Sequence, residues 1–173
     1  MLLIHQIFYS VFPLFLLSSL LLSFSEKGKN GAIKEVSCDE ATKKYELPKF
    51  YVYHLAKIQQ FYLEKLNIPK NKFRFRELGA EERAFYNKIH FDIELDLETL
   101  GGWKEVAGCH MRGSHDLEGH QKGSNEKLEV LSDGKKILPH VLELSFGVDR
   151  NIWALLDLTY SMEKERELFS LPA

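Results

Sequence analysis

An alternation of apolar and acidic residues, FDIELDLETLGG from Phe91 to Gly102, constrains the fold of this chain more than any other stretch. Successive side chains of a β-strand point to opposite faces, so one face of this run is apolar and the other carries Asp92, Glu94 and Asp96. The two closing glycines favour a turn. We expect a half-buried strand whose carboxylates form a solvated face. A second interpretation is that these carboxylates face a cleft and hold a divalent cation.

Three other segments have the composition of helices. Apolar residues at 3.6-residue spacing predict a helix that begins at Lys49 and ends before Pro69. The stretch GAEERAFYNK, residues 79–88, resembles a second helix. The stretch from Asp149 to Glu163 is apolar nearly all round, which predicts a buried helix.

Further short strands are expected on both sides of the acidic run. FRFREL alternates briefly, WKEVAGCHMRG predicts the next strand, and LEVLSDGKKILPHVLELS predicts a hairpin because Asp133-Gly134 is a strong two-residue turn signal. The order of helix, successive strands and helix predicts an α+β fold, with an antiparallel sheet flanked by helices. We expect three strands, at Phe91–Leu97, Trp103–Cys109 and Val141–Phe146, to be neighbours.

The N-terminal segment differs from the rest in composition, because it has no charged residue before Glu26. Its length is enough to span a bilayer, for which about 20 apolar residues suffice. It is either a signal or membrane anchor through residues 2–24, or an artefact such as a wrongly assigned start. We divide the chain into a leader at 1–25, a linker at 26–46 and a domain at 47–173. The leader is expected to form a helix over Leu2–Phe24 that makes few contacts with the domain.

Charge and cysteine usage exclude some classes of function. A formal net charge of -2 gives no electrostatic argument for a nucleic-acid partner. The two cysteines are far apart and define neither a zinc ribbon nor a disulfide scaffold. A cluster of possible metal ligands consists of Cys109, His110, His115 and His120. Its spacing matches no familiar closed zinc site, so we expect a metal-free polar loop.

Arg150 is surrounded in the sequence by apolar residues, in the stretch LELSFGVDRNIWALLD. A guanidinium stays charged and therefore needs either a carboxylate or an anionic ligand when it is buried. The start of a helix offers free N–H groups, the arginine adds a bidentate donor, and Gly147 lets a ligand approach the backbone. Together they form a candidate anion clamp. The alternative is an internal ion pair with Glu143 or Glu105.

Two segments carry a resemblance to a known family. PHVLELSFGVDRNIWALLD resembles motif 3 of the class II aminoacyl-tRNA synthetases, and is similar to the signature P-x-V-I-E-P-S-F-G-(I/L)-(D/G)-R of glycyl-tRNA synthetases of the archaeal and eukaryotic type. GGWKEVAGCHMRGSHDLEGH resembles the G-W-x-E-x-x-G segment of that family and the residues after it. The likeness runs from roughly Leu47 to Ala173 and implies the C-terminal part of a class II catalytic domain.

The resemblance implies a glycine--tRNA ligase, which activates glycine with ATP and transfers it to tRNA-Gly in the cytoplasm. Magnesium is expected with ATP. The resemblance assigns the glycine pocket to Glu143, Leu144, Ser145, Phe146 and Gly147. It assigns the nucleotide site to Glu105, Val106, Gly147, Val148, Asp149 and Arg150. Among these, Arg150 is the catalytic residue, which contacts the phosphates and stabilises charge on the leaving pyrophosphate.

Several departures from the family pattern accompany the likeness. Leu144 stands where proline is usual, His110-Met111 replaces a pair such as Ala-Asp, and His115 replaces an aromatic residue. Motif 1 and motif 2 of the class are not found. We therefore expect the chain alone to be inactive and expect a separate chain with those motifs, whereas the full-length family implies a homodimer. The alternative is a non-catalytic paralogue or a membrane-attached accessory module.

Overall fold

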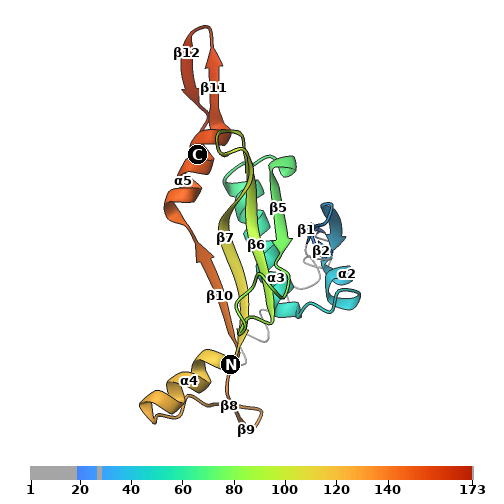
Figure 1. Ribbon diagram of the computed structural model, residues 1–173, viewed down its shortest axis with the longest axis vertical. Coiled ribbons are helices and arrows are strands. Elements are labelled where there is room, and N and C mark those ends of the chain that lie inside the picture. Colours follow the sequence, from blue (N-terminus) through green and yellow to red (C-terminus); the bar gives the residue numbers. More distant parts are fainter. Residues whose placement is uncertain (1–18, 27–28, 173) are drawn as a thin grey trace.

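The structure, a computed structural model, describes residues 19–26 and 29–172, and its centre is a six-stranded sheet (Figure 1). The strand order is β10-β7-β6-β5-β1-β4. The strands are β1 (Ser19–Ser23), β4 (Lys34–Ser37), β5 (Phe73–Glu77), β6 (Ile89–Leu97), β7 (Gly102–Gly113) and β10 (Val141–Phe146). Their pairings are antiparallel except the parallel pair of β1 with β5. The predicted α+β fold with an antiparallel sheet and flanking helices is confirmed, apart from this one parallel pair.

The three strands that we expected to be neighbours are β6, β7 and β10. Ala107 of β7 pairs with Ile93 on one side and with Phe146 on the other. Helix α5 (Val148–Thr159) begins directly after β10 and contacts both β6 and β7. The predicted arrangement of this part of the sheet, with the last helix behind it, is confirmed.

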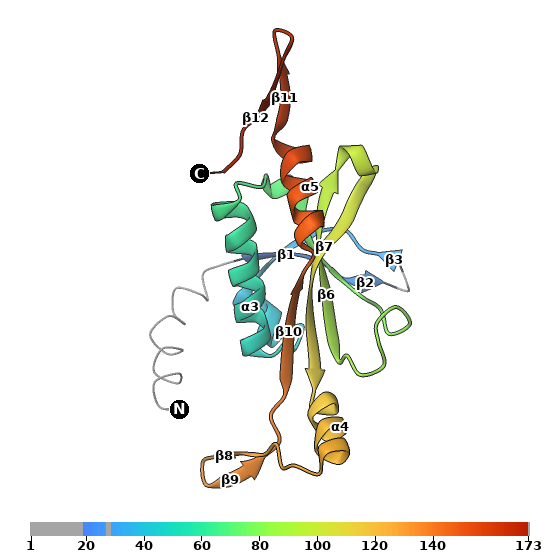
Figure 2. The same cartoon turned by 90° about the vertical axis from the view of Figure 1, so that its left-hand side faces the viewer.

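One face of the sheet is covered by helix α3 (Lys49–Gln60), which continues into the π-helical turn η1 (Phe61–Lys65) (Figure 2). The helix predicted from Lys49 is therefore confirmed. The short helix α2 (Cys38–Lys43) contacts α3. The buried hydroxyl of Tyr51 donates to the carbonyl of Cys109 at 2.6 Å and accepts the N–H of Phe91 at 3.2 Å. Because these two groups lie on paired strands, Tyr51 fixes α3 to the β6–β7 ladder.

The expectation of an independent N-terminal helix is wrong for residues 19–24. Ser19–Ser23 forms β1, which lies between β4 and β5 in the sheet. The side chains of Leu20 and Leu22 are fully buried in the core. An apolar run without charges suits a strand with both faces covered, just as it suits a helix. The rest of the predicted helix, up to residue 18, lies outside the described residues, and the division at residues 25 and 46 stays a prediction.

No helix in the described part of the chain is long and apolar enough to cross a membrane.

The helix expected at residues 79–88 is absent, and this segment forms a series of turns. The N–H groups of Glu82 and Arg83 both donate to the carbonyl of Gly79, which closes only a local turn. The side chain of Glu82 accepts the N–H of Gly79 and also pairs with Arg76 at 2.8 Å. The Arg76 guanidinium holds the pKa of Glu82 below its usual range. These side-chain contacts compete with a helical ladder.

One end of the molecule carries a helix and a hairpin, of which the sequence predicted the hairpin. The Asp133-Gly134 turn joins β8 (Val130–Ser132) to β9 (Lys135–Ile137), and both turn residues have positive φ, as a two-residue hairpin requires. This hairpin is confirmed. Residues 115–124, within which we expected a polar loop, form helix α4 (His115–Ser124). Figure 1 shows α4 and β8–β9 at one end of the molecule.

The C-terminal helix ends earlier than expected. Helix α5 stops at Thr159, and the hairpin of β11 (Tyr160–Glu163) and β12 (Arg166–Phe169) follows it. Tyr160 and Phe169 pair across this hairpin with ring centroids 5.5 Å apart. The remaining short elements are β2 (Ser25–Glu26), β3 (Lys29–Asn30), η2 (Lys70–Lys72) and η3 (Glu98–Leu100).

Candidate functional site

Arg150 lies in the first turn of α5, at the point where the chain leaves β10. The N–H of Gly147 donates to the carbonyl of Val106 at 3.0 Å, and the side-chain amide of Asn151 donates to the same carbonyl at 2.9 Å. The start of α5 is thereby fixed to β7. A Cβ atom at Gly147 would lie 3.4 Å from Cδ of Arg150 and 3.5 Å from the Val106 carbonyl, which are ordinary van der Waals contacts, so the fold itself does not require glycine here.

A hollow of about 510 Å³ opens beside Arg150. It is lined by Leu97, Leu100, Lys104, Glu105, Val106, Asp149, Arg150 and Trp153. Four of the six candidate nucleotide residues therefore border one cavity, whereas Gly147 and Val148 do not line it. Lys104 is a second cation at this hollow, and the sequence reasoning missed it because an isolated lysine on a strand has no signature.

Arg150 has a carboxylate partner but is not buried. Its Nη1 atom lies 3.2 Å from Oε2 of Glu105 and 3.2 Å from the backbone carbonyl of the same residue. The two side chains are 63% and 49% exposed. The ion pair with Glu105, one of the two alternatives from the sequence, is thus present as a surface pair. An exposed pair of this kind leaves the guanidinium accessible to an anion in the hollow.

The expectation that α5 is buried on all sides is wrong. Among its described residues only Ala154 is buried, while Ile152 and Trp153 are about half exposed. Ile152, Trp153 and Leu156 lie at the surface, whereas Leu155 and Leu158 are partly buried against the core. Composition alone was misleading here, because it does not show which sides of a helix the rest of the fold covers.

Glu143 is held by a different arginine. Arg112 of β7 donates from Nη1 to Oε2 of Glu143, and it also binds Asp116 of α4 at 2.5 and 3.0 Å. The guanidinium lies over the ring of Tyr86, 4.5 Å from its centroid. The hydrogen bond from Arg112 holds the pKa of Asp116 below its usual range. The structure does not bring Glu143 into contact with Arg150.

The five candidate residues of the glycine pocket do not share one face of the sheet. Side chains alternate along β10, so Glu143 and Ser145 lie on the face away from α3, while Leu144 and Phe146 lie on the other. The ring of Phe146 stacks against that of Tyr62, with centroids 6.4 Å apart. Only the backbone of Leu144 and Phe146 can therefore contribute to a site on the face that carries Glu143.

Two of the three acidic residues of β6 are buried, so our expectation of a solvated face is wrong for Asp92 and Glu94, whereas Asp96 stays partly exposed and pairs with Lys72. Asp92 and Glu94 are 5% and 7% exposed. Both pair with arginines of β5: Arg74 lies 2.6 Å from Glu94, and Arg76 lies 3.0 Å from Asp92 and 3.0 Å from Glu94. The ring of Trp103 covers Arg74, with 4.4 Å between the guanidinium carbon and the ring centroid. These buried ion pairs leave the two carboxylates no free position for a cation.

The cysteine and histidine candidates do not form one site. Cys109 is fully buried, and burial raises the pKa of its thiol to about 12. His110 lies against His90 with ring centroids 3.9 Å apart, and His115 lies on α4. The described residues contain no group of three or more side chains that could hold a metal ion. The absence of a bound metal stays a prediction.

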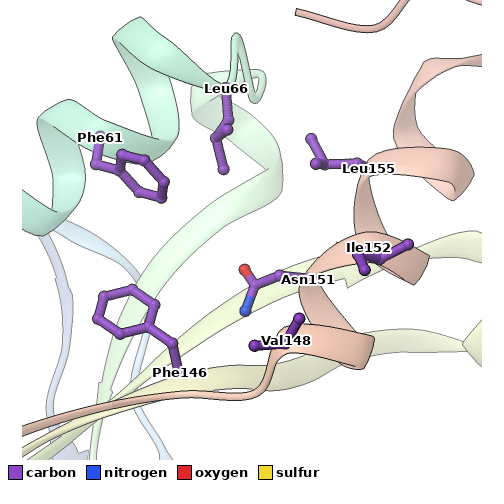
Figure 3. Close-up of a pocket in the computed structure, with 7 residues that line it drawn as sticks. All are labelled: Phe61, Leu66, Phe146, Val148, Asn151, Ile152 and Leu155. Carbon is purple, nitrogen blue, oxygen red and sulfur yellow. The ribbon is translucent and has the colours of Figure 1, made fainter.

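An apolar pocket of about 450 Å³ lies between η1 and α5 (Figure 3). Its lining residues are Phe61, Leu66, Phe146, Val148, Asn151, Ile152 and Leu155. Figure 3 shows the rings of Phe61 and Phe146 on one side of the pocket and Ile152 and Leu155 on the other. No sequence pattern indicated this pocket, because its walls come from segments about ninety residues apart.

The chain is similar to several proteins that share one name. A glycine--tRNA ligase of Mycoplasmopsis synoviae is 40% identical over 124 residues, which cover 70% of this chain. One of Thermococcus kodakarensis is 36% identical over 125 residues, also 70% of this chain. Part of this chain is similar to glycine--tRNA ligases. The match covers 27% and 21% of these two relatives, so the chain spans about a quarter of their length.

A third relative extends the match at lower identity. The glycine--tRNA ligase of Thermococcus sibiricus is 26% identical over 219 residues, covering 82% of this chain and 38% of the relative. None of the known protein-family models matches the chain.

The surface position of Arg150 predicts a small contribution to stability. We expect Arg150→Met to change the free energy of unfolding by less than about 1 kcal/mol, because exposed ion pairs contribute roughly 0–1 kcal/mol. Thermal or denaturant unfolding of the two proteins measures the difference. A loss of about 3 kcal/mol or more, the size expected for a buried pair, would show that the arginine is structural.

Proposed function

We propose that this chain is part of a glycine--tRNA ligase of the archaeal and eukaryotic type. In this proposal it supplies the C-terminal part of a class II catalytic domain, which activates glycine with ATP for transfer to tRNA-Gly. The observation that carries the proposal is the similarity to glycine--tRNA ligases together with the position of Arg150. The arginine stands at a helix start beside a hollow large enough for a ligand.

The hollow at α5 supplies the nucleotide side of the proposed reaction. Arg150 and Lys104 are cations that can bind phosphate oxygens and neutralise the charge that develops on pyrophosphate as it leaves. Glu105 and Asp149 border the same hollow. Magnesium is typically held by one or two carboxylates together with substrate phosphates, so these two residues fit a magnesium ion that arrives with ATP. When bound, the ion would neutralise phosphate charge.

Glu143 supplies the amino-acid side of the proposed reaction. A carboxylate is the natural partner of the glycine ammonium group, and Arg112 fixes this carboxylate in place through one oxygen. Arg112 is itself fixed by Asp116, so the orientation of Glu143 depends on α4. Ser145, two residues further along β10, lies on the same face.

The test of the nucleotide site is an unfolding experiment with the 173-residue protein. We expect ATP with Mg²⁺ to raise the melting temperature, since a ligand at about 100 times its Kd stabilises by about 2.7 kcal/mol. Arg150→Met should remove most of this shift. The matched control is Arg166→Met, which removes an arginine from β12, outside the residues lining the hollow. If ATP stabilised neither the wild type nor the control, the nucleotide site would be refuted.

A non-catalytic paralogue or accessory module is the second candidate. One observation favours it: Glu143 already has a cationic partner in Arg112, which competes with a substrate ammonium group. In that case the chain would keep the fold, and a nucleotide could still bind at the hollow without reaction. Binding of ATP without any glycine-dependent reaction, in the presence of the missing part of a ligase, would support this candidate.

A further inference from the structure

Two rows of paired residues cross β6, β7 and β10 on the face of the sheet that carries Glu143. Residues directly opposite one another on antiparallel strands project to the same face. The first row consists of His90, His110 and Glu143. The second row consists of Asp92, Gly108 and Ser145. Because glycine has no side chain, the second row has a gap at its centre, between a buried carboxylate and a hydroxyl group.

The ring of His110 fills this gap. A Cβ atom at Gly108 would lie 2.3 Å from Nε2, 3.0 Å from Cε1 and 3.3 Å from Cδ2 of the His110 ring. The first of these distances is far below a van der Waals contact, which begins at about 3.5 Å. No side chain at position 108 is therefore compatible with the ring in this position. Gly108 admits the ring, and the ring covers the backbone between Asp92 and Ser145.

Two buried residues hold the His110 ring in place. The ring of His90 lies against it, with 3.9 Å between the centroids. The side-chain amide nitrogen of Asn87 lies 3.4 Å from Nδ1 of His110 and 3.5 Å from Nδ1 of His90. His90 and Asn87 are only 8% and 6% exposed. The position of the His110 ring is thus set by packing against the interior, and it is not one of many surface rotamers.

The charge state of His110 agrees with this position. An amide nitrogen can only donate, so Nδ1 of each ring accepts, and a neutral His110 carries its proton on Nε2. Burial and the neighbouring His90 lower the pKa of His110, so the ring is neutral at pH 7. A neutral ring forms no ion pair with Glu143, and it therefore has no strong attraction away from Gly108.

We propose that His110 closes the amino-acid site of this chain. The inference rests on the proposed function, which places glycine beside Glu143 and Ser145. The His110 ring occupies the space over Gly108 on the floor of that site, so it must swing aside before glycine binds. The usual residue at this position of the family pattern is alanine, whose methyl group is too short to cover Gly108. The chain thus carries a closing group of its own.

The packing is tested first, by a cycle of two substitutions. The backbone at Gly108 has no positive φ, so it can accommodate alanine. Gly108→Ala should lower the melting temperature of the wild type, because the new Cβ atom meets the His110 ring and overpacks the site. In the His110→Ala background the same substitution should leave the melting temperature unchanged or raise it. This difference is the coupling expected of two residues in contact.

Glycine binding is measured with the 173-residue protein, by NMR titration of the amide signal of Ser145. We expect His110→Ala to bind glycine at least about tenfold more tightly than the wild type, since a site that is open about a tenth of the time has about a tenth of its intrinsic affinity. In the wild type, NOE contacts between the His110 ring and the α-protons of Gly108 should disappear on saturation with glycine. The matched control is His54→Ala, on α3 at the other face of the sheet, which should bind as the wild type does.

A second readout is kinetic and uses the remainder of the Mycoplasmopsis synoviae ligase, which is that ligase without the 124 aligned residues. Glycine-dependent exchange of pyrophosphate is measured with this remainder and the chain together. His110→Ala should lower the KM for glycine about tenfold and leave the KM for ATP unchanged. A substitution that only disturbed the fold would change both constants.

Three results would overturn the inference. One is equal glycine affinity of the wild type and His110→Ala. Another is tight glycine binding by the wild type together with binding of alanine by the variant, which would make His110 a determinant of pocket size. The third is an equal loss from Gly108→Ala in both backgrounds, which would show that the ring does not lie over Gly108. If the two substitutions are coupled but neither protein binds glycine, the amino-acid side of the proposed function is refuted, and the closing role with it.

Discussion

Replacing Arg76 by methionine is expected to lower the free energy of unfolding by about 3–5 kcal/mol, because it leaves the buried carboxylate of Asp92 without its arginine and leaves Glu94 with Arg74 alone. The guanidinium of Arg76 pairs with both Asp92 and Glu94, whose side chains are 7% and 9% exposed. Methionine has a similar length and fills the space, so the loss measures charge rather than packing. Urea unfolding at neutral pH gives the value directly.

The matched control for this variant is Lys70→Met. Lys70 pairs with Glu35 at 2.8 Å, but the two side chains are 58% and 51% exposed. We expect this exposed pair to contribute no more than about 1 kcal/mol. Equal losses from Arg76→Met and Lys70→Met would contradict the buried ion-pair network on this face of the sheet.

Leu22→Ala is expected to lower the free energy of unfolding by about 2–5 kcal/mol, the range for a buried leucine whose removal leaves a cavity. Leu22 is fully buried, and its strand pairs with β4 on one side and β5 on the other. The result distinguishes a strand of the core from an attached leader, since an attached leader contributes nothing to the unfolding of the domain.

The control for Leu22→Ala is Leu131→Ala. Leu131 is 65% exposed, so its truncation should change the free energy of unfolding by less than about 0.5 kcal/mol. If the two leucine variants unfolded at the same denaturant concentration, residues 19–23 would not belong to the core.

Strand periodicity predicted the centre of the sheet well. The alternation in FDIELDLETLGG, the following strand and the Asp133-Gly134 turn all appear in the structure. Periodicity reports which face a side chain takes, but it does not report what covers that face. For this reason the burial of Asp92 and Glu94 was missed. The alternating arginines of FRFREL are the signal that could have shown it, because charges of opposite sign at the same period suit paired strands.

The errors at α5 and β1 have one physical cause. Both segments are apolar nearly all round, and an apolar run predicts burial without specifying the partner. Residues 19–23 lie between β4 and β5 in the sheet, so they form a strand and not a free helix. On α5, Ile152 and Trp153 remain about half exposed. Hairpin β11–β12 was missed because its turn consists of Lys164 and Glu165, which adopt positive φ without the glycine or asparagine that usually signals such a turn.

The sequence identified only some of the residues of the candidate site. The resemblance brought together Glu105, Val106, Asp149 and Arg150, and these four do line one hollow. The pairing of Glu143 with Arg112 could not be predicted, since the two residues lie 31 positions apart and meet through the β7–β10 register. Lys104 was missed for a similar reason: its relation to Arg150 depends on how α5 sits against β7.

The most direct test of the account is glycine-dependent exchange of pyrophosphate into ATP by the complex of this chain with the remainder of the Mycoplasmopsis synoviae ligase. We expect exchange with glycine but not with alanine, only when both parts are present, and a loss of at least about a hundredfold with Arg150→Met, since loss of one such charge-stabilising contact costs about 2.7–4 kcal/mol. A purified one-to-one complex without glycine-dependent exchange would contradict the proposed function. Robust exchange by the 173-residue chain alone would contradict the claim that it needs the missing part.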